Sequence, residues 1–199
     1  MIIAEPKIRI GVLALQGSVA EHLSHLALMP DVLPLQVKKP ADLEAIDGLI
    51  LPGGESTTLA RLLKTFALFE PLRQKIQDGL PVWGTCAGLI LLAHKIAGEA
   101  AHLGVMDIRV RRNAFGRQVD SFRQFASIPA ISAEPIELVF IRAPWIEQAG
   151  PAVEILHAIE GKIVAARQKN LLATAFHPEL TGRSDWHRYF AALVAQSLI

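Results

Sequence analysis

The chain has 199 residues, of which 51% are hydrophobic, and its formal net charge is +1. This length and composition suit one compact domain with a sizeable core, and the near-zero charge gives no reason to expect nucleic acid or an anionic membrane as a partner. A single cysteine excludes an internal disulfide, and we expect a cytoplasmic protein because the first residues do not resemble a signal peptide and the most apolar stretch, 82–93, is too short to span a bilayer.

Strands and helices are expected to alternate in the first half of the chain. The expected strands are 8–15, 33–37, 48–51 and 81–83, and the expected helices are 18–28, 57–64 and 71–77. Ser18 and Glu21 are spaced for a capping box at the start of the first helix. Such alternation implies right-handed βαβ crossovers and a largely parallel sheet, in which ligands bind beyond the carboxyl ends of the strands.

The only cysteine lies at the next junction between a strand and a helix. An apolar run enters through Pro81 and residues 89–96 read as a buried helix, so Gly84 and Gly88 would flank a tight turn that carries Cys86. Such a turn pushes the side chain out of the sheet and sets the sulfur near the first N–H groups of the helix, where the thiolate is favoured. The arrangement indicates a nucleophile, whereas an isolated cysteine is more commonly a small buried hydrophobe.

The second half is richer in expected strands, and we see no repeat or linker that would split the chain. The expected strands are 108–111, 138–141, 153–159, 163–168 and 171–176, and a closing helix is expected at 185–196. One domain is therefore predicted for residues 1–199.

A base and its orienting carboxylate are expected directly after the last strand. If the segment stays extended, His177 and Glu179 point the same way and Pro178 points opposite. Glu179 would then hold the imidazole in one tautomer while His177 exchanges a proton with Cys86. His-x-Glu alone occurs by chance in many chains, but together with the cysteine turn it forms a triad hypothesis.

A double glycine follows the strand expected at 48–51. Because glycines have no Cβ, Gly53 and Gly54 can turn their N–H groups toward a ligand, as an oxyanion hole requires. The alternative is an ordinary turn, with Ser56 or Thr57 as the N-cap of the next helix. The oxyanion interpretation requires the loop to lie beside Cys86.

These three pieces together resemble the class I, triad-type glutamine amidotransferases. Six segments narrow the resemblance to the glutaminase subunit family of the two-component pyridoxal 5′-phosphate synthase: 13–17, 52–58, 84–88, 112–118, 140–144 and 176–180. The resemblance implies a single-domain α/β, flavodoxin-like three-layer fold with a central, mostly parallel sheet. It implies no cofactor and no metal.

The resemblance also assigns roles to residues that the patterns alone do not. Its implied catalytic residues are Cys86, His177 and Glu179, its implied glutamine-binding residues are Gly54, Glu55, Ser56, Arg112, Ile141 and Arg142, and oxyanion donors are expected from Gly53, Gly54 and Ala87. A bidentate guanidinium suits the α-carboxylate of glutamine, which favours Arg112. The other arginines of 109–123 are read as a solvated face.

The implied activity is hydrolysis of L-glutamine to glutamate and ammonia through a γ-glutamyl thioester. The ammonia would pass to a synthase subunit in a hetero-oligomer, and we expect Gln16, Gly17 and the region around Glu55 to contribute to the docking face. Two other interpretations stay open: a stand-alone cysteine hydrolase of γ-glutamyl or peptide substrates, and a non-catalytic module that binds glutamine as a signal.

Several other features are given plainer interpretations. His22 and His25 are three residues apart on an expected helix and lack a cluster of further ligands, so they are read as a polar helix face rather than a metal site. The remaining histidines outside the triad receive the same structural interpretation. The chain departs from the family pattern at 182–184, where an acidic residue is common, and 127–135 contains no motif that we can place.

Overall fold

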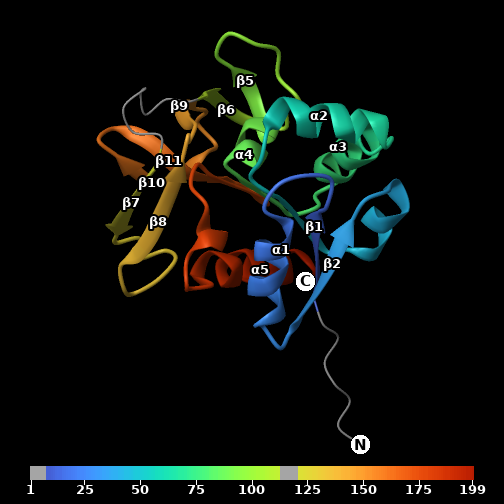
Figure 1. Cartoon of the computed structure of the whole chain (residues 1–199), viewed down its shortest axis with the longest axis horizontal. Coiled ribbons are helices and arrows are strands. Elements are labelled where there is room, and N and C mark those ends of the chain that lie inside the picture. Colours follow the sequence, from blue (N-terminus) through green and yellow to red (C-terminus); the bar gives the residue numbers. More distant parts are fainter. Residues whose placement is uncertain (1–7, 113–120) are drawn as a thin grey trace, which may run out of the picture.

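The computed structural model of the chain describes residues 8–112 and 121–199, and its centre is one ten-stranded sheet (Figure 1). The strands lie in the order β2-β1-β3-β4-β12-β11-β9-β6-β5, with β10 paired to β11. Their bounds are β1 (Ile8–Leu13), β2 (Val32–Val37), β3 (Gly48–Leu51), β4 (Val82–Thr85), β5 (Ala93–Ile96), β6 (Met106–Arg111), β9 (Trp145–Ala149), β10 (Glu154–Ile159), β11 (Lys162–Gln168) and β12 (Leu171–Thr174). Two further strands, β7 (Ser121–Ala126) and β8 (Ile136–Ile141), form a separate antiparallel pair.

The sheet has a parallel half and a mixed half. Strands β2, β1, β3, β4 and β12 pair in parallel, in agreement with the βαβ alternation expected from the first half of the sequence. Beyond β12, the pairs with β11, β9 and β6 are antiparallel, and only the edge pair of β5 and β6 is parallel again. The sheet is therefore mixed and mostly parallel.

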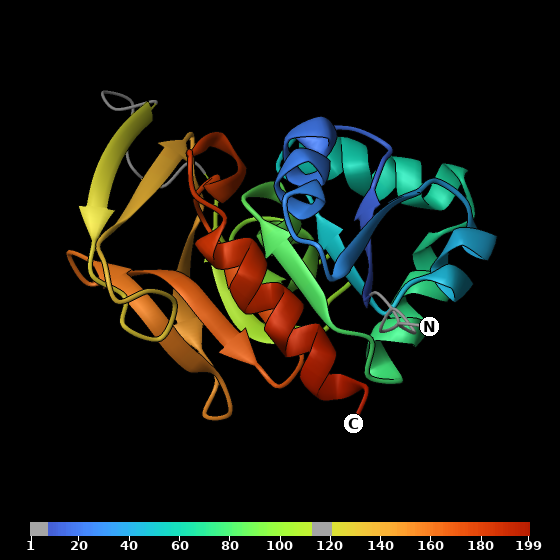
Figure 2. The ribbon, with the colours of Figure 1, turned by 90° about the horizontal axis from the view of Figure 1, so that it is seen from below.

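Helices cover both faces of the parallel half. They are α1 (Val19–Ala27), α2 (Ser56–Thr65), α3 (Phe69–Gln77), α4 (Ala87–Leu92) and α5 (Asp185–Ser197), with short 3₁₀ helices η1 (Pro40–Ala45) and η2 (Pro178–Leu180). Figure 1 shows α1 and α5 on one side and α2 and α3 on the other, and Figure 2 shows α5 running across its face of the sheet. The arrangement has three layers, as expected.

The core is centred on strands that are covered on both faces. Every residue of β3, β4 and β12 is buried, which explains why these strands read as continuous apolar runs rather than alternating patterns. Trp83 of β4 lies with its ring centroid 5.8 Å from that of Phe190 of α5. The carboxyl ends of these strands are thus held firmly in place at the centre of the molecule.

Three local expectations were wrong. The helix expected at 89–96 ends at Leu92, because the next four residues pair with β6 as strand β5. Strands β7 and β9 were not expected; their short, partly polar segments carry little local signal, and their partners lie elsewhere in the sequence. The capping box also does not form, since the side chain of Ser18 makes no cap hydrogen bond.

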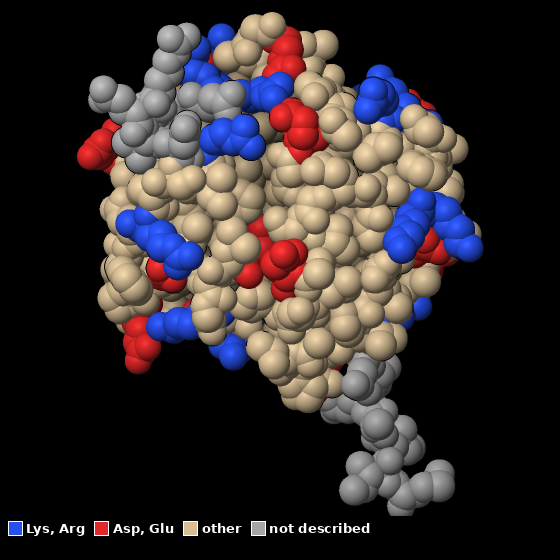
Figure 3. Space-filling model, in the orientation of Figure 1, with Lys and Arg blue, Asp and Glu red and all other residues tan. Residues whose placement is uncertain are grey.

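On the face shown in Figure 3, Lys and Arg lie mainly toward the edge, several of them beside Asp or Glu, and a further acidic group lies near the centre. Across residues 8–112 and 121–199, no helix combines the length and apolar character needed to cross a membrane.

Candidate active site

A cavity of about 440 Å³ opens where several parallel strands end. Its walls come from the segments that follow β1, β3, β4 and β12, together with the chain around residues 112 and 141–144. The lining residues are Gln16, Gly17, Ser18, Glu21, Gly53, Gly54, Glu55, Ser56, Cys86, Ala87, Ile90, Arg112, Ile141, Arg142, Pro144 and His177. Every predicted site residue except Glu179 therefore borders one cavity.

Cys86 occupies the predicted turn between β4 and α4. Its φ of 47° and ψ of −99° are unusual for a residue with a side chain and are typical of strain held at a functional site. A Cβ on Gly84 would overlap the backbone of Gly88, and a Cβ on Gly88 would overlap the carbonyl oxygen of Leu51. Both glycines are needed for this close approach, so the prediction of a tight strand-to-helix turn is confirmed.

His177 joins the cysteine to the buried carboxylate. Its side chain borders the same cavity as Cys86 and interacts with it closely enough to be raised in pKa, and its Nδ1 lies 2.7 Å from Oε1 of Glu179. His177 and Glu179 do lie on one side, but the reason given from the sequence was wrong: Pro178–Leu180 is a 3₁₀ helix, not an extended segment. A single helical turn brings the two side chains together.

The electrostatics of this trio favour a charged pair. Burial alone would lower the pKa of His177, but its contacts with Cys86 and Glu179 outweigh burial and raise that pKa to about 10. Burial likewise opposes ionisation of Glu179, yet the hydrogen bond from His177 helps to hold the pKa of that carboxyl below its usual range. A protonated imidazole beside an ionised carboxylate is the arrangement that these shifts describe for His177 and Glu179.

The double-glycine loop lies beside the triad, as the oxyanion interpretation requires. A Cβ on Gly53 would overlap Cε1 of His177, and the carbonyl of Gly53 accepts a hydrogen bond of 3.1 Å from the amide of Ser18. Between described residues, neither the N–H of Gly53 nor that of Gly54 donates a hydrogen bond. These donors are therefore free for a ligand, and their oxyanion role, like that of Ala87, stays a prediction.

The start of α2 differs from the expectation. Glu55, rather than Ser56 or Thr57, is the N-cap, and its side chain accepts a hydrogen bond from the amide of Thr57. The amide of Glu55 donates in turn to Oε1 of Gln16 at 3.0 Å. The buried hydroxyl of Ser56 has no partner among described residues, so it can hydrogen-bond a ligand in the cavity that it borders.

Arg112 stands at the rim of the cavity between two carboxylates. One terminal nitrogen lies 2.8 Å from Oε1 of Glu55 and the other lies 3.1 Å from Oε1 of Glu99. Ile141 and Arg142 border the same space, with Arg142 at a φ of 43°. The rest of the motif 112–118 lies outside the described residues.

The polar helix face expected for His22 and His25 was wrong. His22, His25 and His187 are 0%, 8% and 0% exposed, and they pack together behind Glu179 rather than forming a polar helix face. The i, i+3 spacing of His22 and His25 was the available signal. Among the described residues, no group of three or more candidate ligands is arranged to hold a metal ion.

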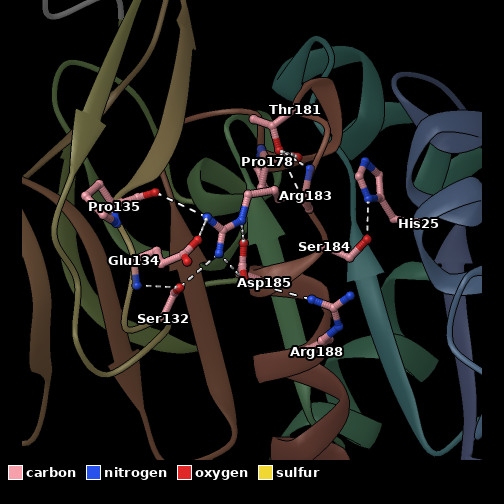
Figure 4. Close-up of polar contacts among 10 residues, drawn as sticks. All are labelled: His25, Ser132, Glu134, Pro135, Pro178, Thr181, Arg183, Ser184, Asp185 and Arg188. Atoms are coloured by element: carbon pink, nitrogen blue, oxygen red, sulfur yellow. Dashed lines mark hydrogen bonds and ion pairs between the residues drawn. The ribbon is translucent and has the colours of Figure 1, made fainter.

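The segments 127–135 and 182–184 contact each other. Arg183 donates to Oε2 of Glu134 at 3.0 Å and to the hydroxyl of Ser132 at 3.1 Å, and it also binds Asp185. Figure 4 shows this arginine reaching from the segment after the triad to the loop at 127–135. Arg183 therefore ties the segment that follows the triad to the loop at 127–135.

Comparison with known proteins shows the family to which this chain belongs. The family model of the SNO glutamine amidotransferases matches residues 12–196. The chain belongs to the SNO glutamine amidotransferase family. The chain is 55% identical over 184 residues to the pyridoxal 5′-phosphate synthase subunit PdxT of Clostridium botulinum, covering 92% of this chain and 95% of the relative. A PdxT of Ruminiclostridium cellulolyticum is 51% identical over 187 residues, covering 94% and 99%.

Solved structures agree with the SNO assignment. A crystal structure described as a glutamine amidotransferase superposes with a TM-score of 0.86 at 42% identity, covering 94% of this chain and 98% of the other. The fold is thus the class I glutamine amidotransferase-like α/β fold, and the predicted fold class and family are confirmed. The roles of the individual site residues stay predictions.

Proposed function

We propose that this SNO family member is the glutaminase subunit of a pyridoxal 5′-phosphate synthase, with Cys86, His177 and Glu179 as its catalytic triad. The observation that carries the proposal is that Cys86 and His177 border one cavity while His177 is hydrogen-bonded to the buried Glu179 behind it. It is supported by relatives named as synthase subunits that match more than nine-tenths of this chain.

The reaction starts with glutamine in the cavity, its side-chain amide carbon facing Cys86. Thiolate attack gives a tetrahedral oxyanion, which the N–H groups of Gly53, Gly54 and Ala87 stabilise; one such donor is worth on the order of 3 kcal/mol. His177 protonates the departing ammonia and leaves a γ-glutamyl thioester. Water activated by His177 then hydrolyses the thioester to glutamate.

Recognition of glutamine uses the opposite wall. The guanidinium of Arg112 pairs with the α-carboxylate, and the backbone of Ile141 and Arg142 contacts the other polar groups. The free hydroxyl of Ser56 and the backbone of Gly54 and Glu55 complete the contacts. Arg112 already pairs with the carboxylates of Glu55 and Glu99. This supports the role, because the α-carboxylate of glutamine is the same kind of group and would replace one of them.

The ammonia is the useful product, and it needs a receiver. Near neutral pH, free ammonia is mostly ammonium and diffuses away, so the glutaminase acts docked against a synthase subunit in a hetero-oligomer. Gln16 and Gly17 border the mouth of the cavity beside Glu55, which supports their part in the docking face. A reducing compartment, the cytoplasm, keeps Cys86 in the reduced form that nucleophilic attack requires.

The test is release of glutamate and ammonia from glutamine by the purified chain, alone and with its synthase subunit, and with Cys86→Ala as control. We expect strong release only with the partner and none from the variant. Equal release without the partner would make the chain a stand-alone hydrolase. No release in either case, with glutamine still bound, would make it a binding module.

A further inference from the structure

Glu179 is held from behind by two histidines of helix α1. His22 Nε2 lies 3.4 Å from Oε2 of Glu179, the carboxylate oxygen that does not face His177. His25 Nε2 lies 3.2 Å from the backbone carbonyl oxygen of the same residue. Both contacts come from one face of α1, because residues three apart on a helix are neighbours.

The partners of these rings fix where their protons lie. The backbone carbonyl of Glu179 can only accept, so His25 carries its proton on Nε2, and its Nδ1 accepts the hydroxyl of Ser184 at 2.8 Å (Figure 4). If His22 instead carried its proton on Nδ1, a bare nitrogen would face the carboxylate of Glu179. His22 is therefore also protonated on Nε2.

His187 completes the chain of hydrogen bonds. Since His22 Nδ1 is then an acceptor, His187 Nε2, 2.9 Å away, must donate to it. The same assignment leaves His187 Nδ1 as a bare acceptor, and this buried atom has no hydrogen-bond partner among described residues. Burial lowers the pKa of His22 to about 4 and that of His187 well below its usual value, so both rings are neutral near pH 7.

Oε2 of Glu179 depends on this donor. It is buried and meets no hydrogen-bond partner in the described chain apart from the long contact with His22. The Nε2–H group of His22 is shared with the hydroxyl oxygen of Thr85, the residue before Cys86, at 3.3 Å. A carboxylate with one oxygen unsupported is free to rotate away from His177.

We propose that His22 is a positioning residue for the glutaminase reaction: its Nε2–H, oriented by His187, holds the Glu179 carboxylate so that Oε1 stays aimed at His177. His25 assists by fixing the backbone of Glu179. This role rests on the proposed function of the triad. It requires a hydrogen-bond donor at the position that Nε2 of His22 occupies, so a polar side chain at position 22 that places no donor there would not be sufficient.

The test compares His22→Gln with His22→Asn in the complex with the synthase subunit. Both introduce a buried amide, but only the longer glutamine side chain can place an N–H near the Nε2 position. We expect His22→Gln to keep kcat within about threefold, and His22→Asn to lose kcat by about 10- to 100-fold with little change in the KM for glutamine. Leu26→Ala, which removes a fully buried apolar side chain from the same helix without removing a hydrogen-bond donor, controls for simple destabilisation.

A second measurement does not depend on glutamine turnover. The rate at which iodoacetamide alkylates Cys86 reports on the thiolate that His177 and Glu179 support. We expect a slower rate in His22→Asn than in His22→Gln or Leu26→Ala. Equal kcat and equal alkylation in the two His22 variants would overturn the positioning role while leaving the triad intact, whereas loss of partner-dependent release in the unaltered chain would count against the proposed function itself.

Discussion

The two walls of the cavity are built in different ways. On the triad side, His177 and Glu179 are 7% and 4% exposed and are held by other buried groups. On the opposite side, the Arg112 side chain is 29% exposed and the Glu55 side chain is 51% exposed, and they are held mainly by each other and by Glu99. Exposed ion pairs contribute only about 0–1 kcal/mol. The catalytic side chains are thus held in place by buried packing. On the recognition side, Arg112 can exchange a carboxylate of the protein for one of the substrate at little cost in free energy.

The largest effect is expected where the triad wall has no spare room. In Gly53→Ala the new Cβ would overlap the ring of His177, so the ring or the glycine loop must move. Misplacement of about 1 Å at a reacting group costs on the order of 10²-fold in rate, and loss of an oxyanion donor adds a comparable factor. We expect kcat/KM of the complex to fall by about 10⁴-fold.

The matched control is Gly182→Ala. A Cβ at Gly182 meets nothing within 4 Å, so this substitution should leave both activity and thermal unfolding unchanged. If Gly53→Ala kept activity within a few-fold of the unaltered chain, the triad wall would be more compliant than its packing indicates.

The buried histidines should make the triad wall sensitive to acid. The pKa of His22 is about 4 when folded, against an unperturbed value of 6.5, so the unfolded chain binds more protons between these values. The contribution of neutral His22 to the free energy of unfolding is then fully present above about pH 6.5. It is lost as the pH falls toward 4, which lowers the free energy of unfolding by about 3 kcal/mol. The folded state keeps His177 protonated throughout this window because its pKa is raised. Its own contribution to stability is therefore fully present in the lower part of the window and is lost only as the pH rises above about 6.5.

Urea unfolding between pH 6.5 and 4.5 measures this effect. His22→Gln removes one titrating group, so the stability of this variant should fall less steeply as the pH falls. The two slopes should differ by up to about 1.4 kcal/mol per pH unit. Parallel stability curves for the two proteins would contradict the assignment of a neutral buried His22.

The recognition wall should respond through KM instead. Arg112→Met removes a charge-assisted bidentate partner for the α-carboxylate, worth about 1.5–3 kcal/mol. We expect KM for glutamine to rise about 10- to 100-fold, with kcat changed much less. The control is Arg111→Met, since Arg111 binds Glu147 and does not border the cavity. A fall in kcat at constant KM would assign Arg112 to the chemistry rather than to binding.

The sequence predicted the buried parts of the fold and the reacting residues better than the surroundings of either. The alternation of apolar runs predicted β1, β3, β4 and β12, because strands covered on both faces carry their own signal. Strand β5 was missed because Ala93–Ile96 follows the apolar run of α4 with no turn residue between them and becomes a strand only by pairing with β6. Pairing partners far along the chain leave no local pattern.

The same limit applies to the site. Cys86 and His177 stood out because a tight turn and a His-x-Glu pair are local features. The contact of His25 with Glu179 joins residues 154 positions apart, so the sequence placed that histidine on a solvent-facing helix. Which histidine supports the carboxylate depends on how α1 packs against η2. The prediction of a single domain stays a prediction.

The smallest effect, and the most informative about the recognition wall, is expected at Glu99. This side chain pairs with Arg112 at 3.1 Å but does not border the cavity. If the ion pair competes with the α-carboxylate of glutamine, Glu99→Gln should lower KM by up to about fivefold, the equivalent of 1 kcal/mol. Steady-state kinetics of the complex measure this, with Glu147→Gln as the control for loss of a carboxylate that pairs with other arginines.

A rise in KM would have a different meaning. It would show that Glu99 keeps the guanidinium of Arg112 directed at the substrate, so that this ion pair belongs to a preformed binding site. The recognition wall would then resemble the triad wall, where each functional group is oriented by a second group behind it. The direction of the change in Glu99→Gln therefore decides whether the two walls follow one principle of construction or two.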